Sequence, residues 1–287
     1  MVKRQIIEQV QQKTGAELLN IKRVGGGSIN RAYCLETENG NYFIKINSSS
    51  KFPGMFEVEA AGLQLLSQSR SVNVPEVILC SDADDESFLL MEWVDARKPT
   101  AKASEDLGRS LAQMHKNVAA CFGLDHDNYM GSLPQSNRQH DTWSAFFIEE
   151  RLQPMVAMAL DKRLLKHNDA AVFEQLYKNL PDLFEDEAPS LIHGDLWGGN
   201  YLVDQDDRPY LIDPAVSYGH REFDLAMTTL FGGFADEFYK AYHESFPLEE
   251  GWERRVDLWN LYPLLVHLNL FGIGYLGQVR DCLRGYV

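Results

Sequence analysis

The sequence has only four cysteines among its 287 residues, and they form neither a CxxC pair nor a metal-ligand spacing. This scarcity excludes a disulfide-stapled or zinc-ribbon protein, so we expect four free thiols. The sequence also lacks any long run of lysine and arginine, and its formal net charge is -15. A chain this acidic, without a basic patch, is not expected to bind nucleic acid.

No uninterrupted apolar run is long enough to span a bilayer. The nearest candidate, residues 258–277, is broken by a proline and polar residues, so we expect a buried helix there and no membrane association. Residues 1–15 contain no apolar stretch typical of a signal peptide. We therefore expect a cytoplasmic protein, and we expect it to be a monomer.

The composition is that of a globular protein, with 45% hydrophobic and 24% charged residues. A β-rich first third is followed by a helical remainder that contains one small hairpin at 200–213, which predicts an α+β fold of two lobes. We place an N-lobe at 1–93 and a C-lobe at 94–287. Strands are predicted at 17–24, 30–37, 41–47, 76–80 and 87–93, and helices at 3–13, 54–69, 104–119, 141–162, 167–179, 222–242 and 252–280.

The strongest motif has the form H-x-D-x4-N and is followed, after the predicted hairpin, by an apolar strand and an aspartate. Phosphoryl transfer needs a carboxylate that accepts a hydroxyl proton and oxygen ligands that hold Mg²⁺ against the phosphates. Asp195 suits the first role, and Asn200 and Asp213 suit the second. His193, which opens the motif, could either orient this loop or contact substrate.

A glycine-rich loop lies between the first two predicted strands and predicts a phosphate-binding turn. A strand rather than a helix follows it, and Asn30 stands where a third glycine would complete GxGxxG, which disfavours a dinucleotide-binding turn. The sequence also has no GK[ST], so a Walker A loop is excluded. The loop residues expected to contact ATP are Gly25, Gly26, Gly27 and Ser28.

A lysine and a glutamate complete the predicted nucleotide clamp. Lys45 is flanked by apolar residues on a predicted strand. Glu59 falls within the apolar stripe of the helix at 54–69, and a carboxylate on a buried face requires a cation. We predict that Lys45 and Glu59 pair, which would hold the lysine toward the α and β phosphates.

The last predicted strand of the N-lobe runs directly into the joint between the lobes. Its backbone could hydrogen-bond an adenine edge, although most of its side chains suit an ordinary core strand. The residues expected there are Met91, Glu92, Trp93 and Val94.

With these elements in order, the chain resembles the fructosamine kinase (ketosamine 3-kinase) family, in the aminoglycoside and choline phosphotransferase branch of the protein-kinase-like superfamily. The resemblance runs from about residue 15 to the C-terminus and is carried by HGDLWGGN at 193–200, YFIK at 42–45, FEVEA at 56–60, DPA at 213–215 and FGGF at 231–234. It implies a two-lobed protein-kinase-like fold that uses ATP and Mg²⁺. It also implies that Asp195 is the catalytic base and that Asp224 braces the catalytic loop.

The resemblance further implies a ketosamine as the acceptor, phosphorylated on its 3-hydroxyl, with aminoglycosides or choline as alternatives. Trp197 stands where protein kinases have a lysine, and an indole face can pack on a sugar. The redox regulation of some fructosamine kinases is not carried over, because their loop cysteine corresponds to Ser28. The candidate substrate residues are Trp197, His193, Tyr218 and His220.

Two rival classes of function remain at this stage. A metallophosphohydrolase could gather several of the same residues as metal ligands, but it would leave the glycine loop and Lys45 without a role. A non-catalytic ATP-binding module would have no need of the three residues Asp195, Asn200 and Asp213 together.

Overall fold

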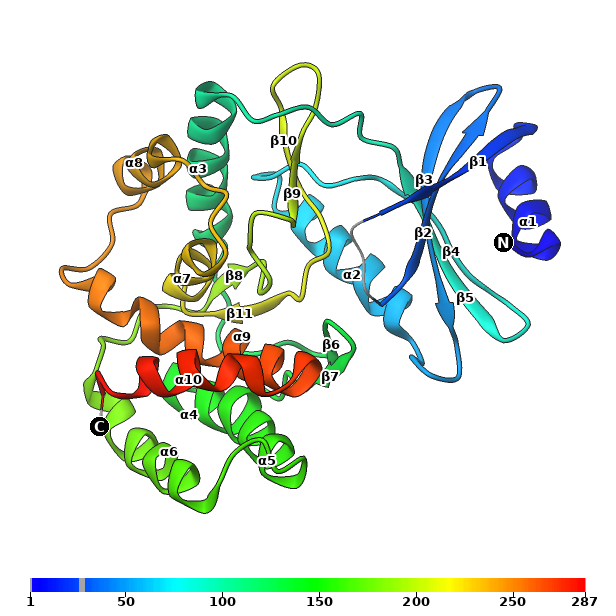
Figure 1. Ribbon diagram of the computed structural model, residues 1–287. Helices are drawn as coiled ribbons and strands as arrows, with labels where there is room; N and C mark the ends of the chain where they lie inside the picture. The colour runs from blue at the N-terminus through cyan, green and yellow to red at the C-terminus, as the bar shows by residue number, and fades with distance from the viewer. Residues whose placement is uncertain (1, 26–28, 287) are drawn as a thin grey trace.

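The computed structural model describes residues 2–25 and 29–286 and shows a β-rich lobe joined to a larger helical lobe (Figure 1). The first lobe is built on a five-stranded antiparallel sheet of order β1-β2-β3-β5-β4. Its elements are α1 (Arg4–Thr14), β1 (Leu18–Val24), β2 (Arg31–Thr37), β3 (Gly40–Ser48), α2 (Met55–Gln68), β4 (Val77–Ala83) and β5 (Glu86–Glu92).

The two faces of this sheet pack against different helices. Ile44 and Ile46 of β3 share a buried cluster with Ile6 of α1. On the opposite face, Leu89 of β5 packs with Phe56 of α2. Because successive side chains of a strand alternate between the two faces, the residue between the two isoleucines of β3 points toward α2.

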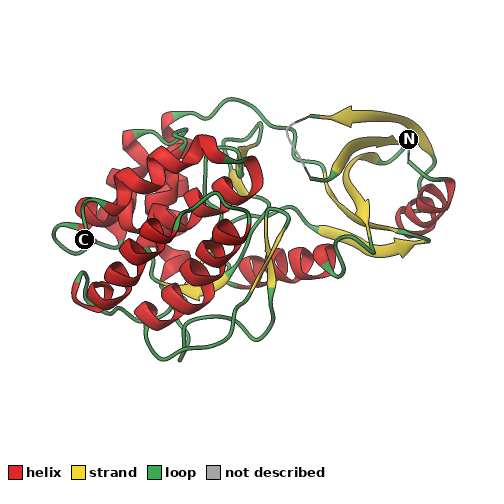
Figure 2. Cartoon of the chain, turned by 60° about the horizontal axis from the view of Figure 1, so that its bottom comes forward, coloured by secondary structure: helices red, strands yellow, loops and turns green. Residues whose placement is uncertain are grey.

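The second lobe is mainly helical, as the view by secondary structure shows (Figure 2). The core of this lobe surrounds α9, which is buried along almost its whole length. Trp143 and Phe147 pack against Trp259, in the first turn of α9. Its helices are α3 (Ala101–His115), α4 (Trp143–Phe146), α5 (Gln153–Asp161), α6 (His167–Asn179), α7 (Glu222–Leu230), α8 (Asp236–Ser245), α9 (Val256–Phe271) and α10 (Leu276–Leu283).

Short strands position the loops of this lobe. The predicted hairpin is present as β9 (Tyr201–Val203) and β10 (Pro209–Leu211). Two further antiparallel pairs were not predicted, because three-residue strands are too short to show an alternating pattern. They are β8 (Ser190–Ile192) with β11 (Ser217–Gly219), and β6 (Asn128–Met130) with β7 (Leu133–Gln135).

Two predicted long helices are wrong as single elements. The helix expected at 222–242 is interrupted between α7 and α8, where Gly232 and Gly233 adopt positive φ. The helix expected at 252–280 is interrupted at Gly272, which has φ 94°. The helix expected at 141–162 is present as one continuous helical run from Trp143 to Asp161, which contains a π-helical turn, Phe147–Leu152, between α4 and α5.

The expected free thiols and the expected buried helix are both present. All four cysteines are free. Within the described part of the chain, no helix is long and apolar enough to cross a membrane, and the apolar stretch at 258–277 is largely the core helix α9.

Candidate active site

The loop that carries Asp195 leaves β8 and is held from below by one buried carboxylate. Asp224 of α7 accepts hydrogen bonds from the backbone N–H groups of His193 at 2.7 Å and Gly194 at 2.8 Å. Gly194 has φ 80°, and a Cβ there would lie 2.1 Å from the carbonyl oxygen of Ala215. Only glycine fits this close approach of two backbones, so the loop conformation is fixed by sequence.

Asp224 is itself held in place by a buried histidine, His115. His115, at the end of α3, places Nε2 3.2 Å from the Asp224 carboxylate and Nδ1 2.8 Å from the hydroxyl of Tyr242. All three side chains are buried. These hydrogen bonds link α3, α7 and α8 to the catalytic loop. Their partners are so far apart in the sequence that residue spacing could not predict the contacts.

His193 supports the loop and does not face the cleft. Its side chain is fully buried, its Nε2 donates to the carbonyl of Ile212 at 3.0 Å, and its Nδ1 accepts the N–H of Asp195 at 3.2 Å. Burial lowers the pKa of His193, which agrees with a neutral ring that makes one hydrogen bond at each nitrogen. Of the two roles left open for His193, its position supports loop orientation and corrects the assignment to substrate.

Asp195 and Asn200 face each other across the loop. The Asn200 amide nitrogen donates to the backbone carbonyl of Asp195 at 2.8 Å and to its carboxylate at 2.9 Å. Burial, together with the charge of Asp213, raises the pKa of Asp195 to about 7. A carboxylate with a raised pKa is a stronger proton acceptor, which is the property that a general base needs.

Asp213 lies opposite Asp195 and contacts the nucleotide clamp. Its carboxylate accepts a hydrogen bond from the ammonium of Lys45, while 44% of its side chain stays exposed. Asp213 has φ 55°, a left-handed conformation that aspartate tolerates better than most residues but that still costs energy. Such a conformation commonly marks a functional position.

The predicted pair in the N-lobe is present. Lys45 Nζ lies 2.7 Å from Glu59 Oε1, and both side chains are largely buried. Burial alone would lower the pKa of Lys45, but the charges of Asp213 and Glu59 outweigh it and raise the pKa above its usual value. Lys45 is therefore a permanent cation that joins the sheet, α2 and Asp213.

We expect Lys45→Met to lower kcat by about a hundredfold and to raise the KM for ATP, because it removes a fixed charge from the phosphate site. Glu59→Ala should act in the same direction but less strongly. The double variant should be little worse than Lys45→Met, because both changes remove one interaction. Steady-state kinetics of the cycle measures this coupling.

A matched control comes from the exposed pair Lys22 and Glu36 on the same sheet. Lys22→Met and Glu36→Ala should leave the kinetics unchanged, because an exposed pair contributes little. Additive effects at Lys45 and Glu59 would contradict the pairing.

Trp197 is exposed, and the loop that carries it has two glycines in close contact with their surroundings. A Cβ on Gly199 would lie 2.2 Å from the indole ring, and a Cβ on Gly198 would lie 2.7 Å from the carbonyl oxygen of Gly232. The HGDLWGGN loop therefore rests backbone to backbone on the segment 231–234. This contact sets the edge of the Phe231 ring beside Trp197, with 6.0 Å between ring centroids.

Gly198→Ala should destabilise the protein by about 1–3 kcal/mol, the usual cost of forcing an extra carbon into a packed contact. Gly277→Ala is the matched control, since a Cβ on that α10 residue would meet nothing within 4 Å. It should leave stability unchanged or raise it slightly, because alanine favours helix. Urea unfolding of the two variants tests the glycine contact, and equal stabilities would contradict it.

The expected substrate role of His220 needs correction, whereas the substrate role of Tyr218 stays a prediction. His220 is only 2% exposed, and its ring stacks on Trp259 with 5.5 Å between centroids. Tyr218 lies in β11, and its side chain lines a hollow of about 440 Å³ with residues of α2 and the 119–126 loop. Neither Asp195 nor Trp197 borders that hollow.

The other residues expected to contact the nucleotide lie at the end of β5 and of β1. Met91 and Glu92 end β5, and Trp93 and Val94 follow at half-buried positions before the chain enters α3. Gly25 follows β1 and is exposed. The other predicted loop residues, Gly26, Gly27 and Ser28, lie outside the described residues.

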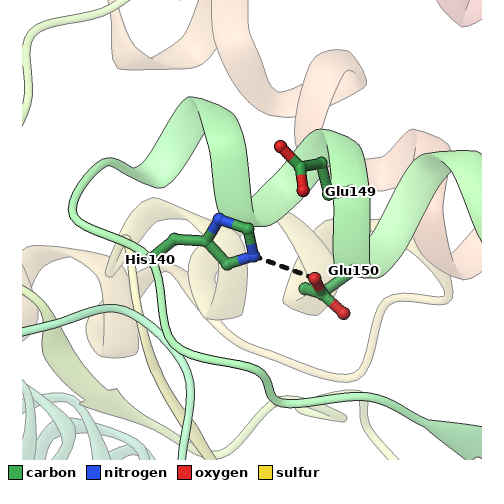
Figure 3. Close-up of side chains that lie close together, drawn as sticks. All are labelled: His140, Glu149 and Glu150. Carbon is green, nitrogen blue, oxygen red and sulfur yellow. Dashed lines mark hydrogen bonds and ion pairs between the residues drawn. The ribbon is translucent and has the colours of Figure 1, made fainter.

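A cluster of possible metal ligands lies away from this loop, formed by His140, Glu149 and Glu150 (Figure 3). His140 Nε2 is 2.8 Å from Glu150. Arg138 already pairs with both carboxylates, at 2.6 Å and 2.9 Å. The guanidinium supplies the positive charge that a metal would bring, so the cluster is a complete ion-pair network. Of the residues that a metallophosphohydrolase would need, His193, Asp224 and His220 are buried and already engaged in hydrogen bonds or ring stacking.

A sheet with a buried lysine–glutamate clamp, set over a braced H-x-D-x4-N loop and a cleft-facing aspartate, defines a kinase-like phosphotransferase. A solved aminoglycoside phosphotransferase shares this fold, with a TM-score of 0.65 at 14% identity over 99% of both chains.

The family model described as fructosamine kinase matches residues 2–287. A ketoamine kinase of Enterococcus faecium is 39% identical over 92% of this chain and 94% of that protein. A chloroplastic protein-ribulosamine 3-kinase of Arabidopsis thaliana is 37% identical over 94% of this chain and 83% of its own. A solved structure assigned as a fructosamine-3-kinase of Thermobifida fusca has a TM-score of 0.90 at 39% identity, over 99% of both chains. The chain belongs to the fructosamine kinase family and is an ATP-dependent phosphotransferase.

Proposed function

We propose that this protein transfers the γ-phosphoryl group of ATP to the 3-hydroxyl of a ketosamine, the adduct of a sugar with an amine. The observation that carries the proposal is that one loop holds both Asp195 and, two residues further on, the exposed ring of Trp197. The names of the relatives, ketoamine kinase and protein-ribulosamine 3-kinase, support the same substrate class. We also propose a lobe boundary at Trp93–Val94 and a cytoplasmic monomer.

The residues opposite Asp195 fit a magnesium ion. The Asn200 amide nitrogen is committed to Asp195, which leaves its Oδ1 as the group available to a cation. Asp213 adds a charged oxygen ligand with an exposed side chain. Hard oxygen donors of this kind suit Mg²⁺. When bound with ATP, the ion would neutralise charge on the phosphates.

The chain's own residues then have distinct tasks. Lys45 holds phosphate oxygens, and Glu59 keeps its ammonium in place. Asp195 accepts the proton of the attacking hydroxyl, aided by its raised pKa. Trp197 offers a flat apolar surface on which one face of the sugar can lie, so that the hydroxyl is held near Asp195.

The chemistry of the product gives the reaction a purpose. A ketosamine carries its carbonyl at C2 and its nitrogen at C1, so enolisation toward C1 places a C3 substituent in position for elimination. A hydroxyl is a poor leaving group and a phosphate is a good one. Phosphorylation at C3 therefore commits the adduct to release its amine, which reverses glycation.

A side-by-side assay separates this proposal from other alcohol kinases. ATP consumption is measured with ribuloselysine, fructoselysine, an aminoglycoside and choline at equal concentrations. We expect turnover with the ketosamines alone. Turnover confined to the aminoglycoside or choline would replace the proposed substrate class and leave the phosphotransferase assignment in place.

A further inference from the structure

A series of buried hydrogen bonds ends on the backbone just after Asp213. Asn128 of β6 donates from Nδ2 to the carbonyl of Val216 at 2.9 Å. Gln135 of β7 donates from Nε2 to Asn128 Oδ1 at 2.8 Å, and the Tyr262 hydroxyl on α9 donates to Gln135 Oε1 at 2.5 Å. We call Asn128, Gln135 and Tyr262 the hydrogen-bond relay. Their exposed fractions are 6%, 4% and 2%, so water does not supply substitute partners.

The relay can be satisfied in one direction. A backbone carbonyl such as that of Val216 can accept but not donate, so Asn128 must turn its nitrogen toward it. Asn128 Oδ1 is then left to accept from Gln135, and Gln135 Oε1 is left to accept from Tyr262. Burial raises the pKa of Tyr262 to about 12 against the opposing charge of Arg151, so the hydroxyl keeps its proton and can donate. A buried network in which every bond is made holds its members in one arrangement.

The relay is one of three attachments of the segment 213–216. The N–H of Ala215 donates to the carbonyl of His193 at 2.9 Å, which joins the segment to the catalytic loop. The side chain of Val216 packs on α2 at Gly62, where a Cβ would lie 3.1 Å from Val216 Cγ2. The relay joins the same segment to the β6–β7 hairpin and to α9. Because Asp213 adopts an unfavourable left-handed conformation, it depends on such support from its neighbours.

The hairpin that carries the relay also contacts the N-lobe. The Tyr129 hydroxyl donates to the carbonyl of Pro53, just before α2, at 2.9 Å. β6 packs on α2 (Figure 1). At the hairpin turn, a Cβ on Gly131 would lie 3.6 Å from the side chain of Ile29, which precedes β2. The hairpin is therefore fixed to both lobes, and through the relay it can set where the segment 213–216 lies relative to each of them.

We propose that Asn128 and Gln135 are positioning residues for the magnesium ion: with Tyr262 as their anchor, they hold the backbone at Val216 so that the Asp213 carboxylate stays in place to bind it. This inference rests on the proposed placement of magnesium at Asp213. The relay acts through the backbone of the segment and not through its own contact with the ion. Mg²⁺ demands near-ideal octahedral geometry, so a small displacement of one ligand weakens its binding.

The test measures ATP binding by calorimetry at a series of magnesium concentrations, with no acceptor present. Asn128→Ala should raise the magnesium concentration needed for half-maximal ATP binding about tenfold, the usual effect of removing a group that orients a metal ligand. Gln135→Leu, which keeps the size of the side chain, should act in the same direction but less strongly. The double variant should be little worse than Asn128→Ala, because both changes interrupt one relay. With ribuloselysine as acceptor, saturating magnesium should return kcat of Asn128→Ala close to the wild-type value.

Asn269→Ala on α9 is the matched control. Asn269 is also 6% exposed, and its Nδ2 likewise donates to a distant backbone carbonyl, that of Met155, at 2.9 Å. Its loss should lower the unfolding midpoint much as Asn128→Ala does, because each change removes a buried hydrogen bond. The magnesium requirement of Asn269→Ala should stay that of the wild type.

Three results would overturn the proposal. An unchanged magnesium requirement in Asn128→Ala and Gln135→Leu would show that the relay supports the fold alone, and Gln135→Leu decides if Asn128→Ala does not fold. An equal rise in Asn269→Ala would assign the effect to general loss of stability. Wild-type ATP binding that is independent of magnesium would remove the metal from Asp213 altogether. Since the binding measurement contains no acceptor, it stands apart from a failure of ribuloselysine as the substrate.

Discussion

Asp195→Asn is expected to lower kcat by roughly a thousandfold, because an amide cannot accept the proton of the attacking hydroxyl. The change keeps the shape of the side chain, and Lys45, Asn200 and Asp213 still bind the nucleotide. ATP affinity should therefore stay within about threefold of the wild type. Single-turnover kinetics and direct measurement of ATP binding separate the two effects.

Asp206→Asn is a suitable control for this substitution. Asp206 lies in the turn between β9 and β10, and its side chain is 77% exposed. The control should keep wild-type turnover. Near-normal turnover of Asp195→Asn would remove Asp195 from the role of base.

Asp213→Asn should weaken the binding of magnesium and its nucleotide and raise the KM for ATP by roughly a hundredfold, because the charged ligand is lost. Asparagine tolerates the left-handed backbone of this position, so the effect does not report misfolding. Asn200→Ala should have a smaller effect, since it removes a neutral ligand. Magnesium titrations of ATP turnover, with the unfolding midpoint as a check on stability, measure both.

The order of these two effects is the informative result. A larger loss for Asn200→Ala than for Asp213→Asn would place the cation elsewhere. Full activity of the wild-type enzyme after magnesium is chelated would contradict the metal assignment for both residues.

The Lys45–Glu59 clamp and the catalytic loop could be predicted from the sequence because each depends on a short-range pattern. Lys45 alternates with buried isoleucines on one strand, and Glu59 falls on the apolar stripe of one helix, so both had to face the same interior. The distance of 2.7 Å between their charged groups agrees with that expectation. Asp195 and Asn200 belong to one motif, and their mutual hydrogen bonds are local.

The features that the sequence could not predict depend on contacts between distant segments. The hydrogen bond between His115 and Asp224 joins α3 to α7, and the two residues are 109 positions apart in the sequence. The stacking of His220 on Trp259 removed a polar residue from the cleft, and nothing near His220 in sequence indicates that partner. The contact between Gly198 and Gly232 accounts for the glycines at 198–199 and 232–233, but it becomes visible only in the folded structure.

The most direct test of the central claim is to locate the phosphate on the product. The enzyme is incubated with ATP and a ribuloselysine uniformly labelled with ¹³C in the sugar, and coupling between phosphorus and carbon is read by NMR. Coupling centred on C3, followed by release of free lysine on standing, is the predicted result. A phosphate on another hydroxyl, or a phosphorylated adduct that retains its amine, would contradict the proposal that this kinase reverses glycation.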